Sequence, residues 1–320
     1  MASPNMPFIK NLASSDSKIR KSALTSLQTF LSAKHIATTL GPIDILKLWK
    51  GLFYAMWMCD RAIPQQTLCQ ELADLIYILP RESVVPWLRG FWATMSREWT
   101  SIDVLRMEKF LLLVRRVVGA SFRWMKGAQD GREDVSAATK QTKKGGKKAA
   151  AAKEKTAWDA KRVDQILDML SEWAFALDED VKEDDSESEE SEAENDDNEN
   201  DEDAKPQHES IRQQKQPKKK ENKDPLHLLA KKIPAGLKIH VLDIWVDEAE
   251  KVGMLDFEND EEALKIVQRT IEKIEELEKR TVSPAIRVRS KDSLSDERLP
   301  GNEKKEPEEK EDEGWGGFDN

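Results

Sequence analysis

The sequence predicts an all-α protein, built as a HEAT- or armadillo-like α-solenoid or as an irregular helical bundle, with long disordered charged insertions and a disordered tail. Three observations predict this fold. Apolar residues recur at spacings of three and four through residues 1–126, which is the period of a helix face. Strand-like alternation with hairpin turn signals is missing from the sequence. Residues 178–224 contain four apolar residues in 47, too few to join a core.

The first three helices are bounded by residues suited to helix ends. Ser15 or Asp16 can accept the first free amide hydrogens of a helix that continues to about Leu31. Pro42, directly after Gly41, suits the first turn of a second helix that reaches about residue 59. A third helix is expected from about residue 64 to 79, where Pro80 stops it.

Two more helices complete the N-terminal region. The fourth is expected from Ser83 to about Trp99, and the fifth from Thr100 to about Lys126, with Asp103 forming a variant capping box with Thr100. Helix pairs of about 40 residues indicate a solenoid of stacked repeats. Because the units do not match one another position by position, an irregular bundle remains the alternative.

Helical patterns resume after a basic loop, from Trp158 to Leu177, then from Asp224 to Gly253 with an interruption at Pro234, and from Asn259 to about Arg280. The expected organisation therefore has six parts. They are a helical repeat body (1–126), a flexible basic loop (127–156), a helix packing on the body (157–177), a disordered acidic then basic linker (178–224), C-terminal helices (225–280) and a disordered tail (281–320).

The net charge of −10 is very unevenly distributed. Residues 178–203 hold 17 Asp/Glu and one Lys, whereas residues 1–126 hold 17 Lys/Arg and nine Asp/Glu. This asymmetry favours a polyanion-binding body with an acidic arm. Two cysteines, no apolar run of 18 residues and no signal-peptide pattern predict an intracellular soluble protein without membrane contact.

An enzyme would need a constellation of reactive groups, and the sequence offers none. The four histidines are scattered, no Cys or His pair has the spacing of a metal site, and no glycine-rich turn for a nucleotide follows a strand. Carboxylate pairs occur in the acidic tract, where nothing would fix their geometry. We therefore expect no catalysis, no cofactor, no metal and no small-molecule substrate.

The most distinctive segment is residues 48–60. Its aromatic residues Trp49, Phe53 and Trp57 are spaced by four and form one stripe of a helix that is apolar nearly all round. Such a helix is typically buried between layers. The stripe is therefore interpreted as core, with a surface for a partner helix or peptide as the alternative.

This segment resembles the signature of the nucleolar ribosomal-RNA-processing protein 1 family, the Nop-type assembly factors of the large ribosomal subunit. Two further blocks resemble the same family, around Arg106–Arg116 and Pro234–Glu248. The matching residues of the first block include Trp49, Lys50, Gly51, Phe53, Tyr54, Trp57 and Asp60, and those of the other two include Arg106, Lys109, Phe110, Arg115, Arg116, Lys238, His240, Asp243 and Glu248. Ala62 and Glu108 depart from the family pattern, where proline and aspartate are expected.

The resemblance implies a non-catalytic protein of the nucleus and nucleolus, working as an RNA- and protein-binding helical scaffold. It would bind early large-subunit precursors and be required for processing of the precursor RNA. Its expected partners are precursor ribosomal RNA, other assembly factors and ribosomal proteins. A chaperone for histones or basic ribosomal proteins, using the acidic tract, is the alternative.

Basic side chains are the candidates for RNA contact, because lysines and arginines neutralise phosphates and release counterions. A basic cluster after the acidic tract is a candidate nuclear localisation signal, and two serines inside that tract have an acidic residue three positions on. The RNA candidates are Lys18, Arg20, Lys21, Arg115, Arg116, Arg123, Lys126, Lys140, Lys143, Lys144, Lys147 and Lys148; the localisation candidates are Lys218, Lys219 and Lys220; the phosphorylation candidates are Ser186 and Ser191.

Overall fold

The computed structural model describes residues 6, 8–127, 158–177, 233–257 and 259–302. Within these ranges the chain is helical, and its only β-type pairing is an isolated bridge between Lys126 and Trp158. The all-α prediction is therefore confirmed. None of the helices in the described ranges is long and apolar enough to span a membrane.

The N-terminal helices follow the predicted order, with shifted ends. They are α1 (Ile9–Leu12), α2 (Ser17–Ser32), α3 (Lys34–Ala37), α4 (Pro42–Trp57), α5 (Ala62–Asp74), α6 (Arg81–Glu98) and α7 (Val104–Met125). Short 3-10 turns follow α5 (Leu75–Tyr77) and α6 (Trp99–Ser101). The C-terminal helices are α9 (Ala160–Glu172), α11 (Ala235–Lys251), α12 (Glu261–Arg280) and α13 (Pro284–Leu294).

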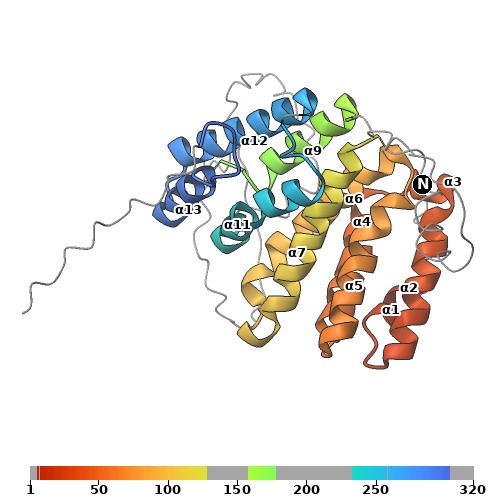
Figure 1. The fold of residues 1–320 in the computed structure, drawn as a ribbon. Coiled ribbons are helices and arrows are strands. Elements are labelled where there is room, and N and C mark those ends of the chain that lie inside the picture. Colours follow the sequence, from red (N-terminus) through yellow and green to blue (C-terminus); the bar gives the residue numbers. More distant parts are fainter. Residues whose placement is uncertain (1–5, 7, 128–157, 178–232, 258, 303–320) are drawn as a thin grey trace, which may run out of the picture.

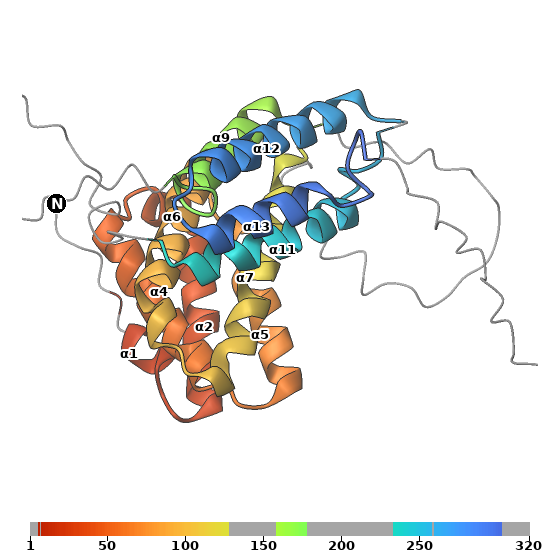
Figure 2. The same cartoon turned by 90° about the vertical axis from the view of Figure 1, so that its left-hand side faces the viewer.

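Successive helices alternate between two layers, which is the arrangement expected of a solenoid. In one layer α4 packs on α6, α6 on α9 and α9 on α12. In the other layer α5 packs on α7, α7 on α11 and α11 on α13. Figure 1 shows the consequence: the red N-terminal helices and the blue C-terminal helices lie at opposite ends of the body, and Figure 2 views the body from the blue end. Position along the chain thus becomes position along the molecule.

Aspartates cap four of these helices. The Asp16 carboxylate accepts the amide of Lys18 at 2.7 Å, as predicted for the start of α2. Two other predicted caps were wrong by one to three residues. Asp103 rather than Thr100 caps α7, and Asp260 rather than Asn259 caps α12. In both helices the aspartate directly before the first helical residue accepts a hydrogen bond from a backbone amide of the first turn. Its negative charge is also stabilised by the positive end of the helix dipole.

The prediction that residues 281–320 form a disordered tail was wrong for its first part. Pro284 begins α13, whose Ile286 and Ser290 are buried. The helix packs on α11 and α12 and is anchored to α11 through Ser293, whose hydroxyl accepts the Trp245 indole N–H at 2.7 Å and donates to the Leu242 carbonyl at 2.8 Å. Few apolar residues were needed, because the fixed neighbours supply most of the core.

The described residues on either side of the predicted basic loop lie next to each other. The amide of Asp159 donates to the Met125 carbonyl at 2.9 Å, so the start of α9 is held at the end of α7. The predicted loop lysines 140–148 lie outside the described residues. So do the localisation candidates at 218–220 and the serines at 186 and 191.

Candidate functional site

The first sequence block is mostly core. Trp49, Gly51 and Phe53 are buried, and the Trp49 indole N–H donates to the Trp87 carbonyl at 2.9 Å. Phe53 stacks on Phe110 of α7 with ring centroids 4.6 Å apart. The core interpretation therefore describes this part of the stripe, and its glycine lets α1 approach closely: a Cβ at Gly51 would lie 3.1 Å from the Leu12 side chain.

The same block reaches the surface at its other positions. Lys50 and Asp60 are exposed, while Tyr54 and Trp57 are half-buried. The Arg106 guanidinium lies over the Trp57 ring, 4.7 Å from its centroid, and contributes a cation–π contact. This end of α4 thus meets the second block, which begins at Arg106.

Lys109 joins the first two blocks most directly. Its side chain is almost fully buried, and its ammonium donates to the Trp57 carbonyl at 2.7 Å and to the Cys59 carbonyl at 2.9 Å. Asp60 lies 3.7 Å away. Burial lowers the pKa of this ammonium, an effect that the Asp60 carboxylate opposes. Lys109 therefore satisfies carbonyls that the C-terminal end of α4 leaves without a helical partner.

Ion pairs join the second block to the third. The Arg115 guanidinium of α7 donates to the Glu248 carboxylate of α11 at 2.7 Å and also contacts Asp247. Burial lowers the pKa of Arg115, but the hydrogen bonds that its guanidinium donates to both carboxylates outweigh this effect, so the pKa is raised. Gly119 allows this close packing, since a Cβ there would lie 2.5 Å from a Glu248 oxygen. Arg298, from beyond α13, extends the network to Asp247 at 2.9 Å.

Two further residues of the third block also make contacts within the body. The Lys238 ammonium donates to the Ala176 carbonyl at 2.6 Å, and the His240 ring lies 2.9 Å from the Leu111 carbonyl. Burial lowers the pKa of His240. The first and third blocks are 174 positions apart, from residue 60 to residue 234, yet both pack on α7, which carries the second block.

The predicted RNA-contacting side chains fall into two groups. Lys18 and Lys21 are exposed on α2, and Arg20 beside them donates to the carbonyls of Ser14 and Ser15, both at 2.8 Å. The α7 candidates are differently placed: Arg115 is paired as described, and Arg116 is half-buried. Arg123 donates to the Tyr77 hydroxyl at 3.2 Å and lies 3.7 Å from Asp74, while the Lys126 ammonium lies 4.8 Å from the Trp158 ring centroid.

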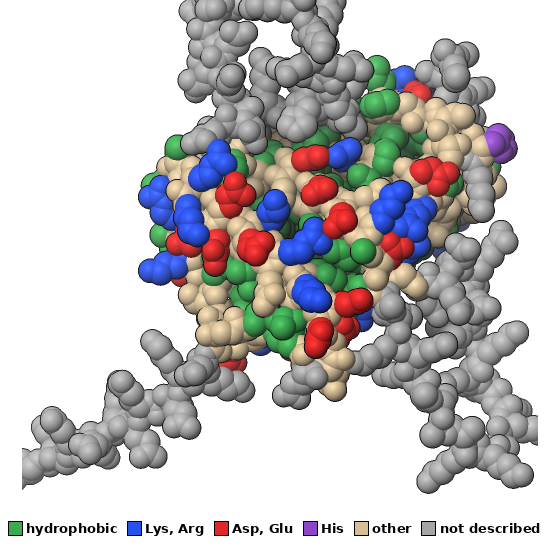
Figure 3. Space-filling model, turned by 90° about the horizontal axis from the view of Figure 1, so that it is seen from above, with side chains coloured by type: hydrophobic (Ala, Val, Ile, Leu, Met, Phe, Trp, Pro, Cys, Tyr) green, Lys and Arg blue, Asp and Glu red, His purple; other side chains and the backbone are tan. Residues whose placement is uncertain are grey.

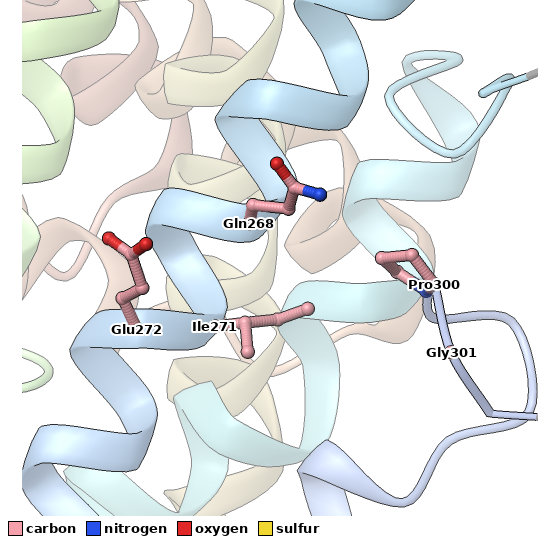
Figure 4. Close-up of a pocket in the computed structure, with 5 residues that line it drawn as sticks. All are labelled: Gln268, Ile271, Glu272, Pro300 and Gly301. Carbon is pink, nitrogen blue, oxygen red and sulfur yellow. The ribbon is translucent and has the colours of Figure 1, made fainter.

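A shallow hollow of about 440 Å³ lies between α12 and the segment after α13. Figure 4 shows Gln268 and Ile271 on the side of α12 toward Pro300, whereas the Glu272 carboxylate turns away. Glu272 is the one ionisable residue of this lining. Among the described residues no group of three or more His, Cys, Asp or Glu is placed to hold a metal ion.

Comparison with known proteins agrees with the three blocks. The sequence matches the family described as "Nucleolar protein, Nop52" over residues 3–179 and 218–315. It is 30% identical over 171 residues to the mouse ribosomal RNA processing protein 1 homolog A, covering 52% of this chain and 29% of that protein. It is 36% identical over 129 residues to the human homolog B, covering 39% of this chain and 17% of that protein. It is 34% identical over 137 residues to the Caenorhabditis elegans homolog, covering 41% of this chain and 34% of that protein.

Proposed function

The chain belongs to the Nop52 family of nucleolar proteins, and we propose that it acts in ribosome biogenesis as a non-catalytic scaffold on precursors of the large subunit. In this role it binds precursor ribosomal RNA together with other assembly factors and ribosomal proteins in the nucleolus, and RNA processing depends on its presence. The relatives, all ribosomal RNA processing protein 1 homologs by name, support a role in ribosome biogenesis. The matched segments cover about a sixth to a third of these relatives.

One structural observation carries the scaffold interpretation: the chemistry-bearing side chains of the three blocks are used in packing. Lys109, Arg115 and Glu248 have the functional groups of catalytic residues, yet their partners are backbone carbonyls and each other across helix interfaces. A catalytic group must instead reach a substrate atom. Residues with these contacts hold the helices at a fixed distance from one another. The outer surface of the body is then the part that can bind macromolecules.

The proposal is tested by rapid depletion of the protein in cells, followed by pulse labelling of ribosomal RNA and gradient sedimentation of the tagged chain. We expect large-subunit precursor RNA to accumulate, small-subunit RNA to mature at its usual rate, and the tagged chain to sediment with large-subunit precursors. Sedimentation with small-subunit precursors, or normal RNA maturation after depletion, would contradict the proposal. Re-expression of the unaltered chain should restore processing, which attributes the defect to loss of this protein.

A further inference from the structure

We infer that the phosphate-binding surface of this protein lies on the N-terminal end of the solenoid, on α1, α2 and α4, and that Lys10, Lys18, Lys21 and Lys50 form it. This inference rests on the proposed RNA-binding function and assigns it to a surface. Three observations support it: charge is unevenly distributed along the solenoid, many cations of the other helices form salt bridges, and these four lysines are exposed.

Charge changes sign along the body. Residues 8–59, which form α1 to α4, contain seven Lys/Arg and two Asp/Glu. Residues 233–302, which form α11 to α13, contain 11 Lys/Arg and 16 Asp/Glu. Because chain position corresponds to position along the solenoid, the two ends differ in electrostatic potential (Figure 1). A polyanion is attracted to the N-terminal end and repelled by the other.

Many cations in the rest of the described chain are paired with carboxylates of neighbouring helices. Arg89 binds Glu172 at 2.6 Å, Arg269 binds Asp164 at 2.8 Å and Arg298 binds Glu250 at 2.7 Å. Figure 3 shows one face on which acidic and basic side chains are interspersed in this way. Such cations would have to leave a carboxylate before they neutralised a phosphate, and the same applies to Arg115.

The four lysines are placed differently. Each is exposed, and within the described residues none forms a salt bridge. The acidic residues of α2 and α4 and of their flanks have other partners: Asp16 caps α2, Asp44 is buried with Lys47 at 3.6 Å, and the exposed Asp60 lies 3.7 Å from Lys109. Within the described residues none of them forms a salt bridge with the four lysines.

Local contacts bring the lysines to one region. Gly51 packs on α1 at Ile9 and Leu12, so that Lys50 and Lys10 flank the same contact. Lys18 and Lys21 are three residues apart and share a face of α2. Helix α1 packs on both α2 and α4, so the lysines of these three helices lie on adjoining elements. Exposed lysines on adjoining elements suit the backbone of RNA, whose recognition needs charge rather than a pocket.

The test compares two full-length variants with equal changes in charge. The first replaces Lys10, Lys18, Lys21 and Lys50 with Gln. The control replaces four lysines of the other helices that also form no salt bridge within the described residues, namely the exposed Lys161, Lys265 and Lys291 and the half-buried Lys273. Glutamine and lysine have similar helix propensities, and circular dichroism and thermal unfolding establish that both variants are folded. Affinity for a long stem–loop RNA is then measured over a salt series.

We expect the slope of log affinity against log salt to fall by about three in the first variant, since each neutralised phosphate contributes about 0.7–0.9. The control should keep the parent slope and bind within about threefold of the parent, because its lysines lie in acidic surroundings. Equal losses in both variants, or a parent slope in the first, would overturn the assignment while RNA binding itself stands. Failure of the parent protein to bind RNA would instead refute the RNA-binding function and, with it, this surface.

Discussion

Replacement of the buried Lys109 with methionine is expected to destabilise the body by about 1–3 kcal/mol. Methionine preserves most of the side-chain volume but cannot donate a hydrogen bond. The Trp57 carbonyl, now 2.7 Å from the ammonium, would lose this donor, and a buried acceptor left unpaired costs about 1–3 kcal/mol. The Cys59 carbonyl would lose the ammonium at 2.9 Å but keep the Gln65 amide N–H at 2.8 Å. Relief from burying a charge offsets part of this cost.

The measurement is urea unfolding followed by tryptophan fluorescence. Lys50→Met on exposed α4 surface is the matched control and should change the free energy of unfolding by less than about 0.5 kcal/mol. A double-mutant cycle with Asp60→Asn should give a coupling below about 1 kcal/mol, because Asp60 is 78% exposed. A Lys109→Met protein as stable as the parent would refute the capping role, and a large coupling to Asp60 would show that the ion pair dominates.

Three further predictions follow from the packing. Gly90→Ala should destabilise the body by about 1–3 kcal/mol in thermal or urea unfolding, since the new Cβ would lie 2.3 Å from Ile45 Cγ2; a smaller effect in an Ile45→Ala background would confirm the clash. Trp57→Ala should cost about 2–3 kcal/mol, less than the 3–5 kcal/mol typical of a fully buried aromatic, because one side of the ring carries only Arg106; unchanged stability would contradict the packing of this ring on Phe110. The folded state lowers the pKa of His240, so the unfolded chain binds the proton more readily and stability should decline as pH falls below about 6.5; His240→Gln should flatten this decline, and an identical pH profile would refute it.

The solenoid was predictable because its signals are local. Apolar spacing gave the helices, and Pro42, Pro80 and Gly253 marked ends that the structure also has, with Gly253 at φ +70° after α11. Helix α13 was missed because the isolated sequence 284–294 has few apolar residues. Its stability depends on α11 and α12, and a pattern within one segment cannot show what neighbours supply.

The candidate site was predictable only in part, for the same reason. Sequence spacing places Trp49 and Phe53 in the core, but it cannot show that Arg115 faces Asp247 and Glu248, 132 and 133 residues away. On sequence alone, Arg115 and Lys18 are therefore equal candidates for RNA contact. The structure separates them, because one guanidinium lies between two carboxylates while the other ammonium faces solvent.

The cationic residues of the three blocks connect neighbouring helices. Lys109 connects α7 to the end of α4, Arg115 connects α7 to α11, and Lys238 connects α11 to the segment after α9. These side chains donate hydrogen bonds to carbonyls at helix ends and to a buried carboxylate, and thereby hold neighbouring helices at a fixed distance. A substitution at one of them would shift one helix relative to the next. Since the proposed RNA surface extends over α1, α2 and α4, its geometry depends on that spacing. Variants in the blocks should then impair RNA binding through loss of stability, whereas variants in the four lysines should impair it in a fully folded protein.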